Sequence, residues 1–401
     1  MISDLWLEDL RAQSRALASA GLKLVLAAPV PEMAGAPAGV NDVEISLRTQ
    51  SFDIFPLPFL PSWKSLPRLR QRLVGRLKEA IESAEIAQIS ADMYGRHAWP
   101  LAGAAGVRRI CVFDGGDLIG QTRLRASQEK NWAKRMVEKL SAQRLEKFCH
   151  SAVGAADLVY AHNPCVAEHL SDVWGSHCHL FERSFVSNEM ILSASELAHR
   201  RNVLRDGASP LRLVVACRQI AIKGIDQIIR AAGLARERGA DVRLDVIGDG
   251  EELPRYKALA AELRLDHAVT FRGALPYGPG LFDTMAESHA MVITNLVPEL
   301  SRNILIAMAR GLPLIIYRNP ASDHLIEATR AGILVPTGDI AALAETLVNC
   351  NLHRQRLVDV MEAGIPAAAA RTLDGCHAKR AQLAAACIKS KLEGRPIVAP
   401  A

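Results

Sequence analysis

Two patterns of apolar and polar positions alternate along this chain. Short, mostly apolar runs predict buried strands, and longer segments with an apolar residue at every third or fourth position predict amphipathic helices. The clearest apolar runs are residues 22–28, 85–89, 109–113, 158–161 and 211–216. Strands that alternate with helices pair in parallel, because a helical crossover returns the chain to the same end of the sheet. The pattern therefore predicts an α/β architecture with doubly wound sheets.

The first predicted element is a helix rather than a strand. Residues 3–20 place apolar side chains, Leu10 and Leu17 among them, at helical spacing, and Gly21 ends the segment. The apolar run 22–28 then follows as the first strand of the pattern.

Length and one polar stretch predict the domain organisation. Single hydrophobic cores stop growing at about 250 to 300 residues, so a chain of 401 residues is expected to form two domains. The polar stretch 193–210 is the best candidate for a linker. We expect an amino-terminal domain at 1–195, a second domain at 208–365 and a terminal helix at 366–392.

Composition excludes several classes of protein. Hydrophobic residues make up 49% and charged residues 23%, as in globular proteins, and no apolar run approaches the roughly 20 residues that cross a bilayer. The early acids Asp4, Glu8 and Asp9 argue against a secretory leader. The net charge of +5 comes without the basic and aromatic stripe typical of nucleic-acid binding. We expect a cytoplasmic chain that is soluble or rests on a membrane surface.

The cysteines give no sign of a disulfide framework or a metal site. Eight cysteines are scattered without a Cys-x-x-Cys pair, which favours reduced thiols in the cytoplasm. A zinc site would have to combine Cys165 with His177, Cys178 and His179. Adjacent residues rarely converge on one tetrahedron, so we expect no metal ion.

Arg218 and Lys223 are the most informative charged residues. They lie in the loop that follows the apolar run 211–216 and precedes an amphipathic helix, which is where ligands bind in open α/β sheets. An arginine grips phosphate oxygens as a fork, a lysine adds a point charge, and the helix dipole supports both. The pair predicts a phosphate-binding site; the alternative is two solvated surface cations.

Further motifs follow this loop in a set order. An Ile-Gly-Asp-Gly turn ends at Gly250, a Phe-x-Gly strand end lies at Gly273, Glu299 precedes a helix, and Ala-Met-Ala-x-Gly-x-Pro ends at Pro313. Together with the Arg-x4-Lys-Gly loop, this order resembles the donor-binding domain of the family 4 retaining glycosyltransferases, which have the GT-B fold. The resemblance is close over residues 211–345 and covers the rest of the chain in outline.

The resemblance implies a fold, an activity and a set of substrates. The fold has two Rossmann-like domains that face each other across a cleft, with the terminal helix packing back on the first domain. Compared with that fold, the first strand of the amino domain is missing here. The implied activity is transfer of a sugar, with retention, from a nucleotide-sugar donor to a glycan or lipid-linked acceptor, as in cell-surface polysaccharide synthesis. The nucleotide sugar is a substrate, and no cofactor and no metal ion is implied.

The resemblance also assigns roles on the donor side. Arg218 and Lys223 would hold the diphosphate, and Glu299 would contact the donor sugar; these three are the expected catalytic residues. The other expected donor contacts are Gly248 and Gly250 in the turn, Arg272 and Gly273 near the base, and Leu300, Ser301, Arg302 and Asn303 at the helix start.

One departure from the family concerns its second glutamate, which binds the ribose. Counting forward from Glu299 places this position at Ala307, and counting back from Gly311 and Pro313 places it at Ile306. We favour Ile306, since more residues anchor that register. A lost charge-assisted hydrogen bond weakens donor binding about ten- to a hundredfold.

Candidates on the acceptor side are less specific. Asp114 and Asp117 end a strand where many relatives carry a histidine, and they either orient an acceptor hydroxyl or form a turn. His97 is either a second acceptor contact or an ordinary loop histidine. The segment 63–81 carries leucines at helical spacing among many cations. It either lies on anionic lipid with its apolar face down, or packs on the core with a solvated basic face.

Two other functions remain as alternatives. A non-catalytic GT-B scaffold that binds glycan, nucleotide or a partner protein would account for the missing glutamate and the missing strand. A sugar-nucleotide epimerase of similar two-domain shape would need acid and base side chains around the sugar, and the sequence has no such constellation.

Overall fold

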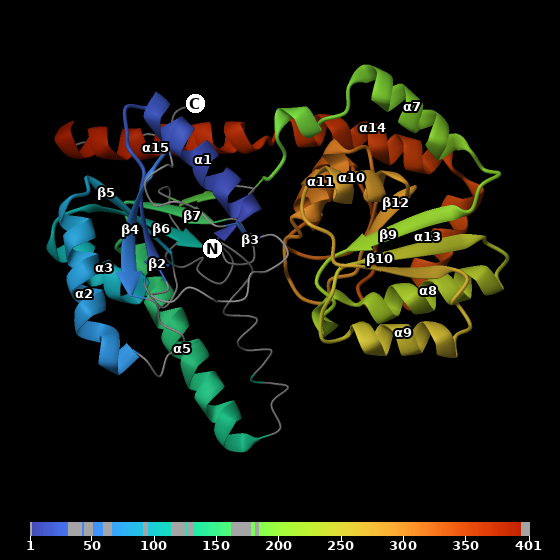
Figure 1. Ribbon diagram of the computed structural model, residues 1–401, viewed down its shortest axis with the longest axis horizontal. Coiled ribbons are helices and arrows are strands. Elements are labelled where there is room, and N and C mark those ends of the chain that lie inside the picture. Colours follow the sequence, from blue (N-terminus) through green and yellow to red (C-terminus); the bar gives the residue numbers. More distant parts are fainter. Residues whose placement is uncertain are drawn as a thin grey trace. The chain divides into compact units, whose positions relative to one another are not determined.

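The computed structural model describes residues 2–30, 42–43, 51–58, 66–90, 95–113, 126, 131–161, 178–180 and 184–393. Contacts divide the chain into two compact units: unit 1 comprises Met1–Arg183 and Asp374–Ala401, and unit 2 comprises Ser184–Leu373. Each unit has its own parallel sheet with helices around it (Figure 1).

Unit 1 is built on a four-stranded parallel sheet. Its strands are, in spatial order, β5 (Ile86–Ser90), β6 (Arg108–Phe113), β7 (Leu158–Ala161) and β8 (Cys178–Leu180). Two smaller sheets pair β2 (Val25–Val30) with β4 (Asp53–Pro58) in parallel and β1 (Ile2–Ser3) with β3 (Asp42–Val43) antiparallel. The helices are α1 (Asp4–Ser19), α2 (Leu66–Glu82), α3 (Gly95–Ala104), α5 (Trp132–Gly154) and nearly all of α15 (Leu373–Glu393). The missing first strand stays a prediction.

Helix α2 decides between the two interpretations of the basic segment. Leu73, Leu77 and Ile81, spaced by four residues, are buried in one core cluster with residues of α3 and β6. The interpretation in which this apolar face lies on lipid is therefore wrong for these side chains, because the protein's own core covers them. The cations Arg68, Arg70 and Arg72 are exposed.

Helix α15 joins the amino-terminal residues through polar contacts. His377 Nε2 lies 3.0 Å from Asp9 Oδ1 of α1, and Tyr160 Oη donates to the carbonyl of Arg380 at 3.2 Å. The expected terminal helix at 366–392 is in fact two helices, because residues up to Ala369 belong to α14 (Gln355–Ala369) of unit 2.

Unit 2 has a six-stranded, wholly parallel sheet. In spatial order its strands are β11 (Val269–Gly273), β10 (Val242–Ile247), β9 (Leu211–Ala216), β12 (Ala290–Ile293), β13 (Leu314–Tyr317) and β14 (Ile333–Val335). The chain order thus runs outward from β9 to one edge and then from β12 to the other. A reversal of this kind is the switch point at which open α/β sheets bind ligands.

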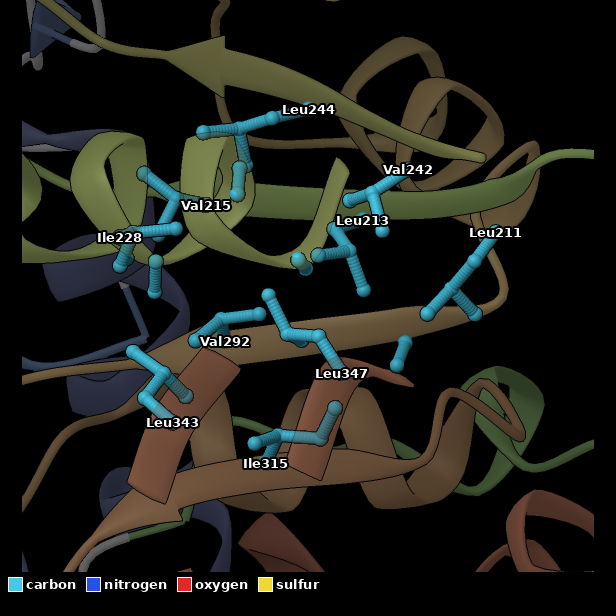
Figure 2. Packing of buried hydrophobic residues seen from close by; sticks show 14 of the residues in the cluster. Leu211, Leu213, Val215, Ile228, Val242, Leu244, Val292, Ile315, Leu343 and Leu347 are labelled. Carbon is cyan, nitrogen blue, oxygen red and sulfur yellow. The ribbon is translucent and has the colours of Figure 1, made fainter. Parts of the chain in front are cut away.

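Strands β12 and β13 of the unit 2 sheet are buried along their whole length, so they are apolar on both faces. Leu211, Leu213 and Val215 of β9 pack into a cluster with α8 (Ile225–Glu237) and α13 (Ile340–Leu352), as Figure 2 shows. Val214 points to the other cluster, which contains α11 (Asn303–Ala309) and part of α10 (Pro279–Ala286). The remaining helices of the unit are α9 (Leu253–Glu262), α12 (Asp323–Thr329), α14 and α7 (Ala194–Arg205).

The polar stretch 193–210 is not a linker, because most of it forms α7. Ser193 caps this helix and Glu196 completes the capping box. Leu204 is fully buried, and the buried guanidinium of Arg200 donates to the carbonyls of Gly311 and Ala286 at 3.0 and 2.8 Å. The stretch is mostly polar because only a narrow face of α7 packs against the rest of unit 2. The chain instead passes between units near residues 183 and 373.

Candidate functional site

The candidate site lies where β9 and β12 end, at the reversal of strand order. β9 ends at Ala216 and β12 at Ile293, and the loops that follow, residues 217–224 and 294–302, carry the expected diphosphate and sugar contacts. The fold therefore brings together two segments that are about 80 positions apart in the sequence.

An ion pair joins these two loops. Lys223 Nζ lies 2.6 Å from Glu299 Oε2, and the side chains are 12% and 29% exposed. Arg218 lies in the same loop as Lys223 and is exposed. Among the residues that the structure describes, no side chain pairs with Arg218. The site thus offers an exposed arginine in the same loop as a lysine that is held in contact with a carboxylate.

Neutral side chains fix the backbone on both sides of the ion pair. Thr294 Oγ1 donates to the carbonyls of Lys223 and Gly224 at 2.8 and 3.1 Å, and the amide of Leu296 donates to the carbonyl of Ile222 at 2.9 Å. These bonds hold the 217–224 loop against the 294–302 loop, which limits the positions that Lys223 can take.

Asn319 holds the backbone of the 294–302 loop. This amide is 4% exposed, and its Nδ2 donates to the carbonyls of Val297 and Glu299 at 2.9 and 3.3 Å. Its Oδ1 accepts from the amide of Ala321 at 2.9 Å. Asn295 also donates to the carbonyl of Glu299, at 3.4 Å. The backbone beneath the Glu299 carboxylate is therefore fixed from two directions.

The sequence analysis missed Thr294, Asn295 and Asn319. Their partners are backbone carbonyls of distant loops, so no local motif identifies them. The signal that was present is their position: polar residues within two positions of the ends of β12 and β13 lie at the ligand-binding edge of a parallel sheet.

Gly248 and Gly250 support the Arg218 loop rather than an open pocket. A Cβ on Gly248, whose φ is +124°, would lie 1.9 Å from the carbonyl oxygen of Cys217, and one on Gly250 would lie 2.3 Å from that of Gln219. The buried Gln219 adds side-chain bonds from Nε2 to the carbonyls of Cys217 and Ile247. The two glycines allow backbone to pack on backbone, which positions Arg218.

The guanidinium of Arg272 is paired with a carboxylate of the same sheet. Its Nε and Nη2 donate to the two carboxylate oxygens of Asp245 on the neighbouring strand at 3.0 and 3.3 Å. Gly273 contributes its carbonyl, which accepts from the amide of Gly248 at 2.7 Å. The role near a base stays a prediction for both residues, and the guanidinium would first have to leave Asp245.

The start of α11 lies against the end of β9. Asn303 Nδ2 donates to the carbonyl of Ala216, and Ser301 and Asn303 line a small cavity of about 20 Å³ together with Cys217 and Lys223. The cavity has room for about one water molecule. Arg302 is directed elsewhere, since its guanidinium lies 5.6 Å from the centre of the Phe185 ring. Leu300 packs against the apolar cluster of α11.

Ile306 does not line the site. It is 2% exposed and Ala307 is fully buried, both within the cluster on the α11 side of the sheet. The expectation that the Ile306 side chain faces a ligand is therefore corrected: in this structure the residue is core. The site has the carboxylate of Glu299 but no second one from α11.

Of the acceptor-side candidates, only His97 lies within the described residues. It is half-buried in α3, and burial, with a contribution from Arg70 and Arg96, lowers the pKa of its imidazole. Asp114 and Asp117 lie outside the described residues. Nothing therefore tests their role.

The described part of the chain gives little support for a nucleophilic cysteine or for a metal site. Burial raises the pKa of the Cys217 thiol to about 11, so it is neutral and poorly nucleophilic near pH 7. No group of three or more His, Cys, Asp or Glu side chains there has the arrangement of a metal site. None of the described helices is long and apolar enough to span a membrane.

Comparison with known sequences shows that the candidate site lies in a segment that matches a protein family. Residues 211–351 match the family model of glycosyl transferases group 1. The amylovoran biosynthesis glycosyltransferase AmsK of Erwinia amylovora is 25% identical over 214 residues, which are 46% of this chain and 52% of that protein. The putative colanic acid biosynthesis glycosyltransferase WcaL of Escherichia coli is 26% identical over 145 residues, 35% of this chain and 36% of that protein. The chain thus spans about half the length of the first relative and about a third of the second.

Comparison with solved structures covers nearly the whole chain. Sucrose-phosphate synthase of Thermosynechococcus elongatus gives a TM-score of 0.67 at 17% identity, over 96% of this chain and 92% of that one. WaaG, a glycosyltransferase involved in lipopolysaccharide biosynthesis, gives 0.64 at 14% identity, over 95% and 96%. Anabaena Alr3699/HepE, in complex with UDP and glucose, gives 0.61 at 18% identity, over 86% and 88%. These likenesses show the fold, which is GT-B, and confirm the resemblance to GT-B glycosyltransferases.

Proposed function

We propose that this GT-B chain is a glycosyltransferase that moves a sugar from a nucleotide-sugar donor, with retention of configuration, to a glycan or lipid-linked acceptor. The observation that carries the proposal is the Lys223–Glu299 ion pair, in the loop that also carries the exposed Arg218, at the strand-order reversal of the unit 2 sheet. This site falls inside the segment that matches glycosyl transferases group 1.

The two cations would act on the leaving group. Negative charge builds up on the nucleoside diphosphate as its bond to the sugar breaks. Arg218 and Lys223 carry permanent charges in the loop at that position before reaction, so they would stabilise the transition state without proton transfer. For this reason the proposal includes no metal ion and no cofactor.

Glu299 would exchange partners when the donor binds. In the structure its carboxylate accepts from Lys223 Nζ at 2.6 Å. A diphosphate that takes over Lys223 would release the carboxylate to accept a hydrogen bond from a sugar hydroxyl. Asn319 and Asn295 would keep the Glu299 backbone in place during this exchange.

The acceptor and the location are also part of the proposal. The relatives AmsK and WcaL are named for the biosynthesis of amylovoran and colanic acid, which supports a role in making a cell-surface polysaccharide. We place the chain in the cytoplasm, attached peripherally to the membrane that carries a lipid-linked acceptor. The exposed cations of α2 support attraction to an anionic surface.

Donor turnover tests this proposal. The protein is incubated with UDP-, GDP-, dTDP- and ADP-sugars, with and without polysaccharide precursors, and the release of nucleoside diphosphate is followed together with the anomeric configuration of the product by NMR. We expect release with one donor class and a retained anomer. Glu299→Gln should abolish release, and Glu237→Gln, at an exposed glutamate of α8, should leave it unchanged.

A non-catalytic GT-B scaffold is the second candidate. The observation in its favour is that Ile306 and Ala307 are both buried and apolar, so α11 offers no carboxylate to a ribose. Nucleotide binding without release from any donor would favour the scaffold.

A further inference from the structure

Helix α5 consists of a packed half and a protruding half. Ala142, Cys149 and Val153 are buried, whereas every residue from Asn131 to Val137 is exposed. Figure 1 shows the amino-terminal end of α5 extending away from the sheet of unit 1. The protruding half therefore contributes little to the core of its own unit.

This protruding half carries an unusual concentration of exposed apolar side chains. Of the seven large apolar side chains that are exposed among the described residues, four lie here: Trp132 (78%), Met136 (51%), Val137 (66%) and Leu140 (44%). Trp132, Met136 and Leu140 are spaced by four, so they line one face of the helix. At 3.6 residues per turn, that face is rotated by about 120° from the face that buries Ala142, Cys149 and Val153. Contiguous exposed apolar patches of this kind mark interaction sites.

The charges around Trp132, Met136 and Leu140, which form an apolar stripe, indicate what kind of partner the stripe binds. Within residues 131–150 there are five cations and two carboxylates, a net charge of +3: Lys134, Arg135, Lys139, Arg144 and Lys147 against Glu138 and Glu146. A second copy of the chain would bring the same excess of cations face to face, which disfavours self-association through this stripe. An anionic lipid surface satisfies both features, since cations bind its head groups and a tryptophan favours the interface.

We infer that the amino-terminal half of α5 inserts Trp132, Met136 and Leu140 into an anionic lipid surface. The inference rests on the peripheral attachment included in the proposed function and names the surface that makes it. The Leu73, Leu77 and Ile81 face of α2 does not supply the apolar contact, because these side chains are buried in the core of unit 1. The inference does not depend on sugar transfer, so lipid binding and donor turnover fail independently.

Co-sedimentation with vesicles tests the inference. Full-length protein is mixed with phosphatidylcholine vesicles that contain phosphatidylglycerol, and with vesicles of phosphatidylcholine alone. We expect binding to the anionic vesicles, and a loss of about tenfold or more in partitioning for W132S/M136S/L140S, since each side chain forfeits apolar burial. Lys134→Gln with Lys139→Gln should weaken binding at low salt and have less effect at high salt.

Two controls separate lipid contact from folding. The variant W132F/M136L/L140M keeps the stripe apolar and should bind as the parent does. Leu352→Ser, at an exposed leucine of α13 in unit 2, should also leave binding unchanged. Equal sedimentation of W132S/M136S/L140S and the parent would overturn the inference while leaving peripheral attachment in place. No binding of the parent to any vesicle would overturn both, and equal binding to neutral and anionic vesicles would overturn the anionic surface named by the inference. Loss of a dimer in the serine variant, without loss of lipid binding, would assign the stripe to self-association.

Discussion

The neutral side chain of Asn319 helps to hold the charged residue Glu299 in position. Its amide donates to the carbonyls of Val297 and Glu299 from a buried position. Asn319→Ala removes both bonds and should lower the free energy of unfolding by about 1 to 3 kcal/mol. Because Glu299 is the proposed sugar contact, we also expect affinity for a nucleotide sugar to fall more than affinity for the matching nucleoside diphosphate. Calorimetric titration of both ligands measures the difference.

Asn202→Ala is the matched control for this prediction, because Asn202 is exposed on α7. It should change neither stability nor affinity. If Asn319→Ala weakens both ligands equally, the residue serves folding alone and has no special relation to Glu299.

Sequence reasoning at the residue scale found charged residues and missed neutral ones. Arg218, Lys223 and Glu299 were identifiable because they stand at set positions in motifs, and the structure brings Lys223 and Glu299 into contact. Asn319 and Thr294 act on backbone carbonyls far away in sequence, and such contacts exist only once the sheet has formed. Ile306 was misplaced because a register count says nothing about which helix face is buried.

At the scale of elements, the turn after β10 controls the loop after β9. Gly248→Ala places a Cβ 1.9 Å from the carbonyl oxygen of Cys217, at a φ that side chains rarely adopt. The loop that carries Arg218 must move, so we expect weaker nucleotide binding and a loss of about 1 to 3 kcal/mol in stability. Thermal melts and nucleotide titrations measure the two effects.

Gly280→Ala, on α10, is the control for steric effects, since a methyl group at this position would meet no other atom within 4 Å. It should melt and bind as the parent does. Unchanged nucleotide binding in Gly248→Ala would mean that the turn does not position Arg218.

The burial of α11 leads to a second prediction at this scale. Ile306→Glu and Ala307→Glu each put a carboxylate into the apolar cluster without a partner. Both should lower the free energy of unfolding by several kcal/mol, as measured by urea denaturation. Tighter nucleotide binding by either variant, with an unchanged denaturation midpoint, would show that this helix face reaches the ligand after all.

The elements themselves were largely predictable. The apolar runs 158–161 and 211–216 coincide with β7 and β9, and 109–113 falls within β6. Residues 158–161 are apolar throughout and β7 is buried throughout, whereas β6 and β9 each carry at least one arginine that is not buried. Helix α7 was missed because a helix with one narrow contact face has the composition of a linker.

For the whole molecule, one buried histidine makes the stability of unit 2 depend on pH. His289 is 3% exposed and accepts a hydrogen bond from the amide of Arg212 at 3.0 Å. Burial, with Arg354, Arg200 and Arg212 nearby, lowers the pKa of its imidazole from 6.5 to about 4. The folded state holds the histidine neutral, so between these values the unfolded state binds more protons.

Stability should therefore fall as the pH drops from 6.5 toward 4, by up to about 3 kcal/mol from this residue. Urea denaturation at a series of pH values measures the slope. His289→Asn keeps an acceptor but removes the titration, so its profile should be flatter. An equally steep profile in this variant would assign the acid sensitivity to other groups.

The family match and the fold likeness cover different parts of the molecule. The match at 211–351 lies wholly within unit 2, whereas the structural likenesses extend over both units. The proposed donor site is thus predictable from the sequence of unit 2. The acceptor side is not, because its candidates Asp114 and Asp117 belong to no distinctive motif.

The central claim is that the end of the unit 2 sheet binds a diphosphate through Arg218 and Lys223. Calorimetric titration of UDP, GDP, dTDP and ADP into the parent protein, Arg218→Ala, Lys223→Ala and Arg230→Ala tests it most directly; Arg230 is an exposed arginine of α8. We predict that the parent binds at least one nucleotide, that the first two variants lose about tenfold or more in affinity, and that Arg230→Ala binds as the parent does. Failure of the parent to bind any of the four, or full affinity in both Arg218→Ala and Lys223→Ala, would contradict the account.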